Sequence, residues 1–182
     1  MRLVDDLVAE YDRFVSLPWR DNLAGPERHW MVIYPPEQER RVRFRLPEFE
    51  GITKKAGHDW VAVELTDSFG RWLAQQEYAE EYYRDPEYLS SALDGFADYV
   101  VSMIEDVLHS PHVDDDTVVA LVGVGSLFPF ARVSDVLQRV SASVSGRMLV
   151  FFPGEKEGST YRLLNARDGW NYLATPITAS RE

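Results

Sequence analysis

The fold class of this chain is indicated most clearly by one segment, Thr117-Val118-Val119-Ala120-Leu121-Val122. It is apolar and mostly β-branched without polar alternation, which is typical of a strand buried on both faces of a parallel sheet. Residues 123–130 then form a glycine-containing loop, and apolar side chains recur at helical spacing after it. These are Val133, Val136, Leu137 and Val140. A buried strand, a loop and an amphipathic helix in this order predict a strand–helix–strand unit.

The same alternation extends outward in both directions. Apolar runs predict further strands at residues 30–34, 60–65 and 148–152, with Pro153-Gly154 ending the last of them and a short strand at 161–164. Helical periodicity predicts helices at residues 3–15, after Thr66, and from Leu89 to a stop before Pro111. We therefore expect one α/β domain over residues 1–182, with a mostly parallel sheet flanked by helices.

Residues 41–46 are ambiguous. Apolar residues alternate with Arg41, Arg43 and Arg45, and a helix here would run into Pro47. We predict a strand over 41–46 with one cationic face, then a helix that begins near Pro47 and buries Phe49 and Ile52. The cluster of Arg40, Arg41, Arg43 and Arg45 is a candidate contact for nucleic acid or an acidic partner. Pairing within the chain, with the acidic and tyrosine-rich stretch 77–87, is at least as well supported.

Composition excludes several function classes. The 182 residues include 30 acidic and 19 basic side chains, a net charge of −11, no cysteine and 45% hydrophobic residues. The apolar content argues against disorder, and the lack of cysteine excludes disulfides, thiolate metal sites and a cysteine nucleophile. The charge disfavours a broad nucleic-acid-binding surface. The acidic start, Asp5-Asp6, and the short apolar run 148–153 predict neither a secretory signal nor a membrane span, so we expect a cytoplasmic protein.

Sites in open parallel sheets form beyond the carboxyl ends of the strands, here after Tyr34, Leu65, Val122 and Phe152. A phosphate-binding P-loop needs a Gly-Lys pair, and none of the three lysines follows glycine. The Gly123-x-Gly125 pair is half of a dinucleotide fingerprint, but a tight turn explains it better. Ser126 has no glycines two residues on either side, so it does not match the nucleophile elbow of serine hydrolases.

Two further motifs have a chemical and a structural interpretation. His109 and His112, followed by Asp114, Asp115 and Asp116, could converge on a metal, but the segment is more typical of a solvated connection. Glu155 lies directly after a strand and could be a general base or part of a charged turn, and we favour the turn. His29 and His58 are expected to be structural. We predict neither a metal nor a cofactor.

Two blocks of sequence together resemble a known family. Val119-Ala120-Leu121-Val122-Gly123-Val124-Gly125-Ser126-Leu127-Phe128-Pro129-Phe130-Ala131-Arg132-Val133 resembles the strand–loop–helix signature of the BrxB family, a small component of bacteriophage-exclusion (BREX) defence systems. Leu149-Val150-Phe151-Phe152-Pro153-Gly154-Glu155, followed by 161–164, is the second block. The first-strand pattern Ile33-Tyr34-Pro35 is similar too. The resemblance extends over the whole chain and is strongest across residues 118–164.

The resemblance implies a cytoplasmic prokaryotic protein whose α/β fold is like a nucleotide-binding domain without its phosphate loop. It implies no known catalytic activity. It also implies assembly with PglZ, a larger member of the alkaline-phosphatase superfamily, and with other defence-system components. We therefore expect a non-enzymatic protein that binds its partner through the loops after Val122 and Phe152. The candidate partner-binding residues are Gly125, Ser126, Phe128, Pro129, Phe130, Arg132, Gly154 and Glu155.

Within this set, Phe128 and Phe130 are candidate aromatic anchors, because buried aromatics and arginines often dominate interfaces. The alternative is that both phenylalanines belong to the core, and for Phe130 the two interpretations are equally supported. The alternative function is a nucleotide- or metal-dependent enzyme that uses Glu155 at the carboxyl edge of the sheet.

Overall fold

The computed structural model describes residues 2–179, and a mixed sheet of seven strands lies at its centre. Five strands run parallel in the order β2-β3-β4-β1-β7. Two short antiparallel strands extend the sheet from the far end of β4. The strands are β1 (His29–Tyr34), β2 (Asp59–Glu64), β3 (Thr117–Val122), β4 (Arg147–Glu157), β5 (Thr160–Leu163), β6 (Trp170–Asn171) and β7 (Thr175–Ile177). The predicted α/β class is confirmed, and the sheet is mixed.

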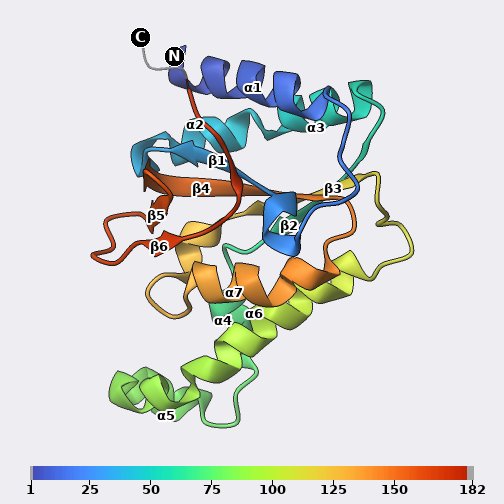
Figure 1. Ribbon diagram of the computed structural model, residues 1–182. Helices are drawn as coiled ribbons and strands as arrows, with labels where there is room; N and C mark the ends of the chain where they lie inside the picture. Colours follow the sequence, from blue (N-terminus) through green and yellow to red (C-terminus); the bar gives the residue numbers. More distant parts are fainter. Residues whose placement is uncertain (1, 180–182) are drawn as a thin grey trace.

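Helices cover both faces of the sheet (Figure 1). One face carries α1 (Arg2–Val15), α2 (Glu39–Phe44) and α3 (Leu46–Lys55). The other carries α4 (Ser68–Ala74), α6 (Leu93–Leu108) and α7 (Val133–Val140). The short α5 (Ala79–Arg84) and the 3-10 helix Pro86–Ala92 lie beyond the second helical layer. Other 3-10 turns span Gly25–Arg28, Pro36–Gln38, Val124–Leu127 and Ser141–Ser143. No helix within residues 2–179 is long and apolar enough to span a bilayer.

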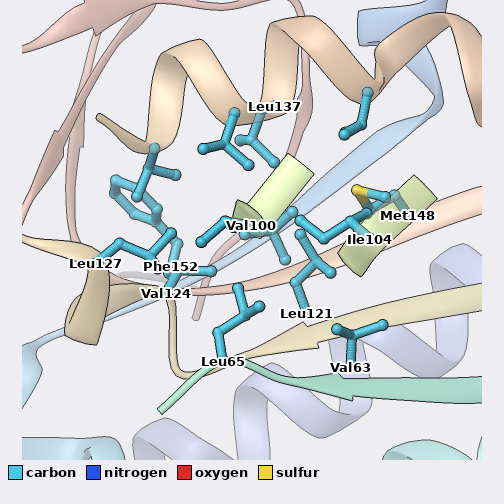
Figure 2. Packing of buried hydrophobic residues seen from close by; sticks show 14 of the residues in the cluster. Val63, Leu65, Val100, Ile104, Leu121, Val124, Leu127, Leu137, Met148 and Phe152 are labelled. Carbon is cyan, nitrogen blue, oxygen red and sulfur yellow. The ribbon is translucent and has the colours of Figure 1, made fainter. Parts of the chain in front are cut away.

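The central strands are buried on both faces, as their unbroken apolar sequences predict. Successive side chains of a strand point to opposite faces, so β1 sends Met31 and Ile33 into one core and Trp30 and Val32 into the other. Figure 2 shows the first of these cores, in which residues of the strands meet residues of the helices above them. The sheet therefore lies between two hydrophobic cores. The loops are exposed along its two edges, the amino edge where the parallel strands begin and the carboxyl edge where they end.

The predicted strand over 41–46 is wrong, because these residues form the end of α2 and the start of α3. In the helix Glu39 and Arg43 lie one turn apart and form an ion pair of 2.8 Å. Burial also does not follow the alternation, since Val42 is buried while Phe44 is 84% exposed. Pro47 lies in the first turn of α3, where a missing N–H is tolerated, so the predicted second helix is confirmed.

The prediction that Pro153-Gly154 ends β4 is also wrong, because the strand continues to Glu157. At this point β4 exchanges its neighbour β1 for β5, and the Pro153 carbonyl accepts a hydrogen bond from the Leu164 N–H at 2.8 Å. A Cβ at Gly154 would come within 2.1 Å of the Arg162 carbonyl oxygen. Glycine is therefore what lets β5 approach, and it extends the strand.

Candidate functional site at the carboxyl edge of the sheet

The loops after β1, β2 and β3 meet the segment of β4 that follows Phe152 at one edge of the sheet, as the parallel direction of these strands requires. Between them lies a central pocket of about 340 Å³. Its lining residues come from the loops after β1, β2, β3 and β5, from Pro153 within β4, and from α2: Pro36, Glu39, Arg43, Thr66, Gly123, Gly125, Ser126, Pro153 and Leu164. The loops that the sequence singled out therefore do form a common site.

A polar network centred on Arg43 forms one wall of the central pocket. Its guanidinium donates to Glu39 at 2.8 Å, to Glu64 at 2.9 Å and to the Thr66 hydroxyl at 2.6 Å. The Tyr34 hydroxyl donates to the second oxygen of Glu39 at 2.6 Å. Burial acts to raise the pKa of Glu64, but hydrogen bonds from Arg43 and Thr66 outweigh it and hold that pKa below its usual range. Both glutamates are thus tied to one cation.

Gly123 lets the β3 loop fit against this network. Its φ of +83° lies in the left-handed region, where a side chain is strained. A Cβ would also come within 2.5 Å of Thr66 Oγ1 and 2.7 Å of Glu64 Oε1. The interpretation of Gly123 as a turn residue is confirmed. Gly125 faces Pro153, whose Cγ would lie 3.2 Å from an added Cβ.

Ser126 joins two of the loops. Its hydroxyl lies 2.6 Å from the Gly123 carbonyl oxygen and 3.0 Å from the Leu65 carbonyl oxygen, and it donates to them. A hydroxyl has one proton, and here two backbone acceptors compete for it. The side chain therefore holds the β3 loop against the end of β2.

Phe128 and Phe130 differ in burial. Phe128 is 45% exposed, whereas Phe130 is half-buried and stacks on Phe69 with ring centroids 3.8 Å apart. Phe130 thus packs against the core that contains α4 and α6. Beside it lies an aromatic pocket of about 650 Å³. This pocket is lined by Leu93, Asp94, Ala97, Pro129, Phe130, Ala131, Arg132, Ser134, Asp135, Gln138, Trp170 and Asn171.

Gly154 and Glu155 lie on the other side of the central pocket. Together with Pro35, Glu37, Arg162 and neighbouring residues they line a hairpin pocket of about 460 Å³. The Glu155 carboxylate accepts a hydrogen bond from Arg162 at 2.8 Å across the β4–β5 pair, and its side chain is 62% exposed. The eight predicted residues therefore lie along one edge but do not share a single pocket.

The predicted site residues did not include the centre of the polar network, which is formed by Glu39, Arg43, Glu64 and Thr66. The signal for the first two was their spacing of four, which indicates a helical ion pair. The expected pairing of the arginines with stretch 77–87 is also wrong for the two that form carboxylate pairs. Arg43 binds Glu39 and Glu64, and Arg45 binds Glu48 and, at 2.6 Å, Asp5.

The histidines lie away from this edge. His29 is fully buried, with its Nδ1 2.7 Å from the Tyr172 hydroxyl, and His58 stacks on Trp19 with centroids 3.7 Å apart. Both pack as structural residues. In the described part of the chain, no three histidine or carboxylate side chains converge to hold a metal, and this includes His109 and His112.

Comparison with known families gives this edge a context. A family model described as "BREX protein BrxB" matches residues 62–177. The chain belongs to the BrxB family. The matched region runs from β2 to β7 and includes the loop after β3 and the whole of β4. Membership makes the chain a component of BREX phage defence, with other BREX components as its partners. No curated protein and no solved structure matches the chain.

Proposed function

We propose that this BrxB-family protein is a non-enzymatic, cytoplasmic assembly component of BREX defence that binds a PglZ-like member of the alkaline-phosphatase superfamily. The observation that carries this proposal is the exposure of Phe128, which stands 45% exposed in the β3 loop at the carboxyl edge. When a partner covers an aromatic ring in this position, apolar surface leaves water, and the free energy of binding becomes more favourable.

The surroundings of Phe128 fit an interface. Pro129 and Arg132 are exposed beside it and line the aromatic pocket, which also contains Trp170. Aromatic and arginine side chains next to a concave surface are the usual anchors of protein interfaces. Gly125, Ser126 and Gly154 shape the loops that present these side chains, and Glu155 adds a carboxylate at the far end of the same edge.

The polar groups of the edge support binding over catalysis. The Ser126 hydroxyl donates to backbone carbonyls, and the guanidinium of Arg43 is engaged by two carboxylates. Backbone carbonyls are not general bases that would activate the Ser126 hydroxyl, and two carboxylates already neutralise the charge that Arg43 would offer to an anionic substrate. We propose that residues 1–182 act as one BrxB-like domain, because α1 and α3 pack against the same sheet as the matched region.

The test is capture of a purified PglZ-like protein from the same BREX system by the full chain. Phe128→Ala should lower the captured amount at least tenfold and shift the melting temperature by less than about 2 °C, because an exposed ring contributes little to folding. Phe44→Ala is the matched control, since Phe44 is also an exposed phenylalanine and lies on α2. Equal capture by Phe128→Ala and the wild type, or an equal loss with Phe44→Ala, would refute the proposal.

One observation favours a second candidate function. Glu155 is 62% exposed and lines the hairpin pocket, which suits a nucleotide- or metal-dependent enzyme. If this second function is correct, a melting-temperature scan with nucleotides and divalent ions should show a shift that Glu155→Gln abolishes. The scan with nucleotides also tests the likeness to a nucleotide-binding domain. The absence of any shift would favour the binding protein.

A further inference from the structure

The acidic, tyrosine-rich stretch 77–88, here called the tyrosine arm, forms α5 and the start of the following 3-10 helix. Figure 1 shows it below the helical layer of α4, α6 and α7, on the side away from the sheet. All of its residues are at least partly exposed to solvent. The arm thus contributes little to the core, and its side chains are available to a partner.

The arm has one anchored and three free tyrosines. Tyr82 packs against the core beside α6, as does Leu89 just after the arm. Tyr78, Tyr83 and Tyr88 are 56%, 64% and 63% exposed. Single exposed apolar residues are ordinary, but three exposed aromatic rings within eleven residues are an unusual concentration, and exposed apolar surface of this kind marks interaction sites. Anchoring through Tyr82 presents the other rings on an ordered element.

The charge of the arm determines what can cover these rings. It contains Glu77, Glu80, Glu81, Asp85 and Glu87 against a single base, Arg84, so its net charge is 1 − 5 = −4. Within residues 2–179 the arm has one ion pair, between Glu80 and Arg84, which is weak because it is 3.8 Å long and mostly exposed. Unlike Arg43 of α2 and Arg45 directly after it, most charged residues of the arm form no ion pair within residues 2–179.

We propose that the tyrosine arm is a second docking element, separate from Phe128, and that it binds an arginine-rich surface of another protein. The faces of tyrosine rings attract guanidinium groups, and carboxylates bind them through paired hydrogen bonds. Tyrosine is also enriched among the residues that dominate binding energy. Nucleic acid would be repelled by the same charge, and a second copy of this chain would bring another acidic surface.

The test uses the full chain and two labelled nine-residue peptides, one alternating arginine with glycine and one alternating lysine with glycine, with binding followed by fluorescence anisotropy. Tyr83→Ala/Tyr88→Ala should weaken arginine-peptide binding at least fivefold, and Glu80→Gln/Glu81→Gln/Glu87→Gln at least tenfold. The lysine peptide should bind at least threefold more weakly than the arginine peptide, since ring stacking favours guanidinium. All substitutions are of exposed residues, so melting temperatures should stay within about 2 °C of the wild type.

A matched charge control is essential because the whole chain is acidic. Asp106→Asn/Asp115→Asn/Asp168→Asn removes the same number of exposed negative charges elsewhere, and it should change the affinity less than twofold. An equal loss from both triple variants would overturn the proposal, since it would mean binding to net charge alone.

Sedimentation showing dimers that dissociate in the tyrosine variant would overturn it in favour of self-association. Retention of DNA by the arm would also overturn it. Capture of the PglZ-like protein by Phe128→Ala does not enter this test, so the two proposals can fail separately.

Discussion

Two arginines at opposite edges of the same sheet are stabilised in different ways. Arg147 opens β4 at the amino edge and is only 4% exposed. It donates to the carbonyls of Arg20 at 2.9 Å and Gly146 at 3.0 Å, and its guanidinium lies 4.9 Å from the Trp19 ring centroid. No ion pair joins it to a carboxylate within residues 2–179. Arg43 at the carboxyl edge has a side chain that is 32% exposed and two carboxylate partners.

The difference shows how each edge is used. At the amino edge, burial and the nearby charge of Arg28 lower the pKa of Arg147, and ring faces and carbonyls offset the desolvation of its charge. Arg147 and Trp19 also line a pocket of about 310 Å³ at this end of the sheet. At the carboxyl edge, hydrated charges, glycine loops and a half-exposed phenylalanine leave pockets between the strands. The buried arginine of the amino edge therefore contributes more to folding, and the partly exposed arginine of the carboxyl edge stays hydrated.

The largest effect that this comparison predicts is for Arg147→Ala. The variant loses two hydrogen bonds from a charged donor and the contacts with Trp19 and Trp30, so we expect the free energy of unfolding to fall by about 3 kcal/mol. Urea titration followed by tryptophan fluorescence measures it. The loss should be the same at low and high salt, because the site is shielded from ions. A loss below about 1 kcal/mol would contradict the structural role of the amino edge.

A second effect at the amino edge depends on pH. Burial lowers the pKa of His29 to about 4, whereas the unfolded chain has its ordinary value of 6.5. Between these values the unfolded state binds a proton that the folded state does not, so stability is full above pH 6.5 and is lost as pH falls toward 4. We expect a loss of about 2 kcal/mol between pH 7 and pH 5. His29→Gln should lack this part of the pH dependence, and identical pH profiles for both proteins would rule out the effect.

The fold was predictable where one local pattern dominated. The apolar runs of β1, β3 and β4 and the helical spacing in α1 and α7 matched the structure, because burial on a sheet or a helix face imposes those periods. The strand predicted at residues 41–46 was wrong because the alternating arginines imitate a strand pattern. The Glu39–Arg43 spacing that indicates the helix begins before residue 41. The predicted end of β4 was wrong because the last residues of this strand pair with β5, and no local sequence pattern indicates that contact.

The site was predictable to the level of its loops. Parallel strands bring their carboxyl ends together whatever their sequences, so four loops could be chosen in advance. The partners within the site could not, since Arg43 meets Glu64 through the pairing of separate elements. The burial of Phe130 against Phe69 likewise depends on how α4 packs beside the β3 loop.

The smallest effect completes the comparison at the carboxyl edge. Arg43→Ala should lower the free energy of unfolding by about 1 kcal/mol, because partly exposed ion pairs gain little over hydration. That loss should shrink as salt rises from 0.05 M to 1 M, in contrast to Arg147→Ala, since ions reach this edge. A double-mutant cycle with Glu64→Gln isolates the Arg43–Glu64 pair, and Arg45→Ala is a control ion-paired arginine outside the pocket. If Arg43→Ala costs as much as Arg147→Ala and is insensitive to salt, then both edges stabilise the fold equally and the division between them does not hold.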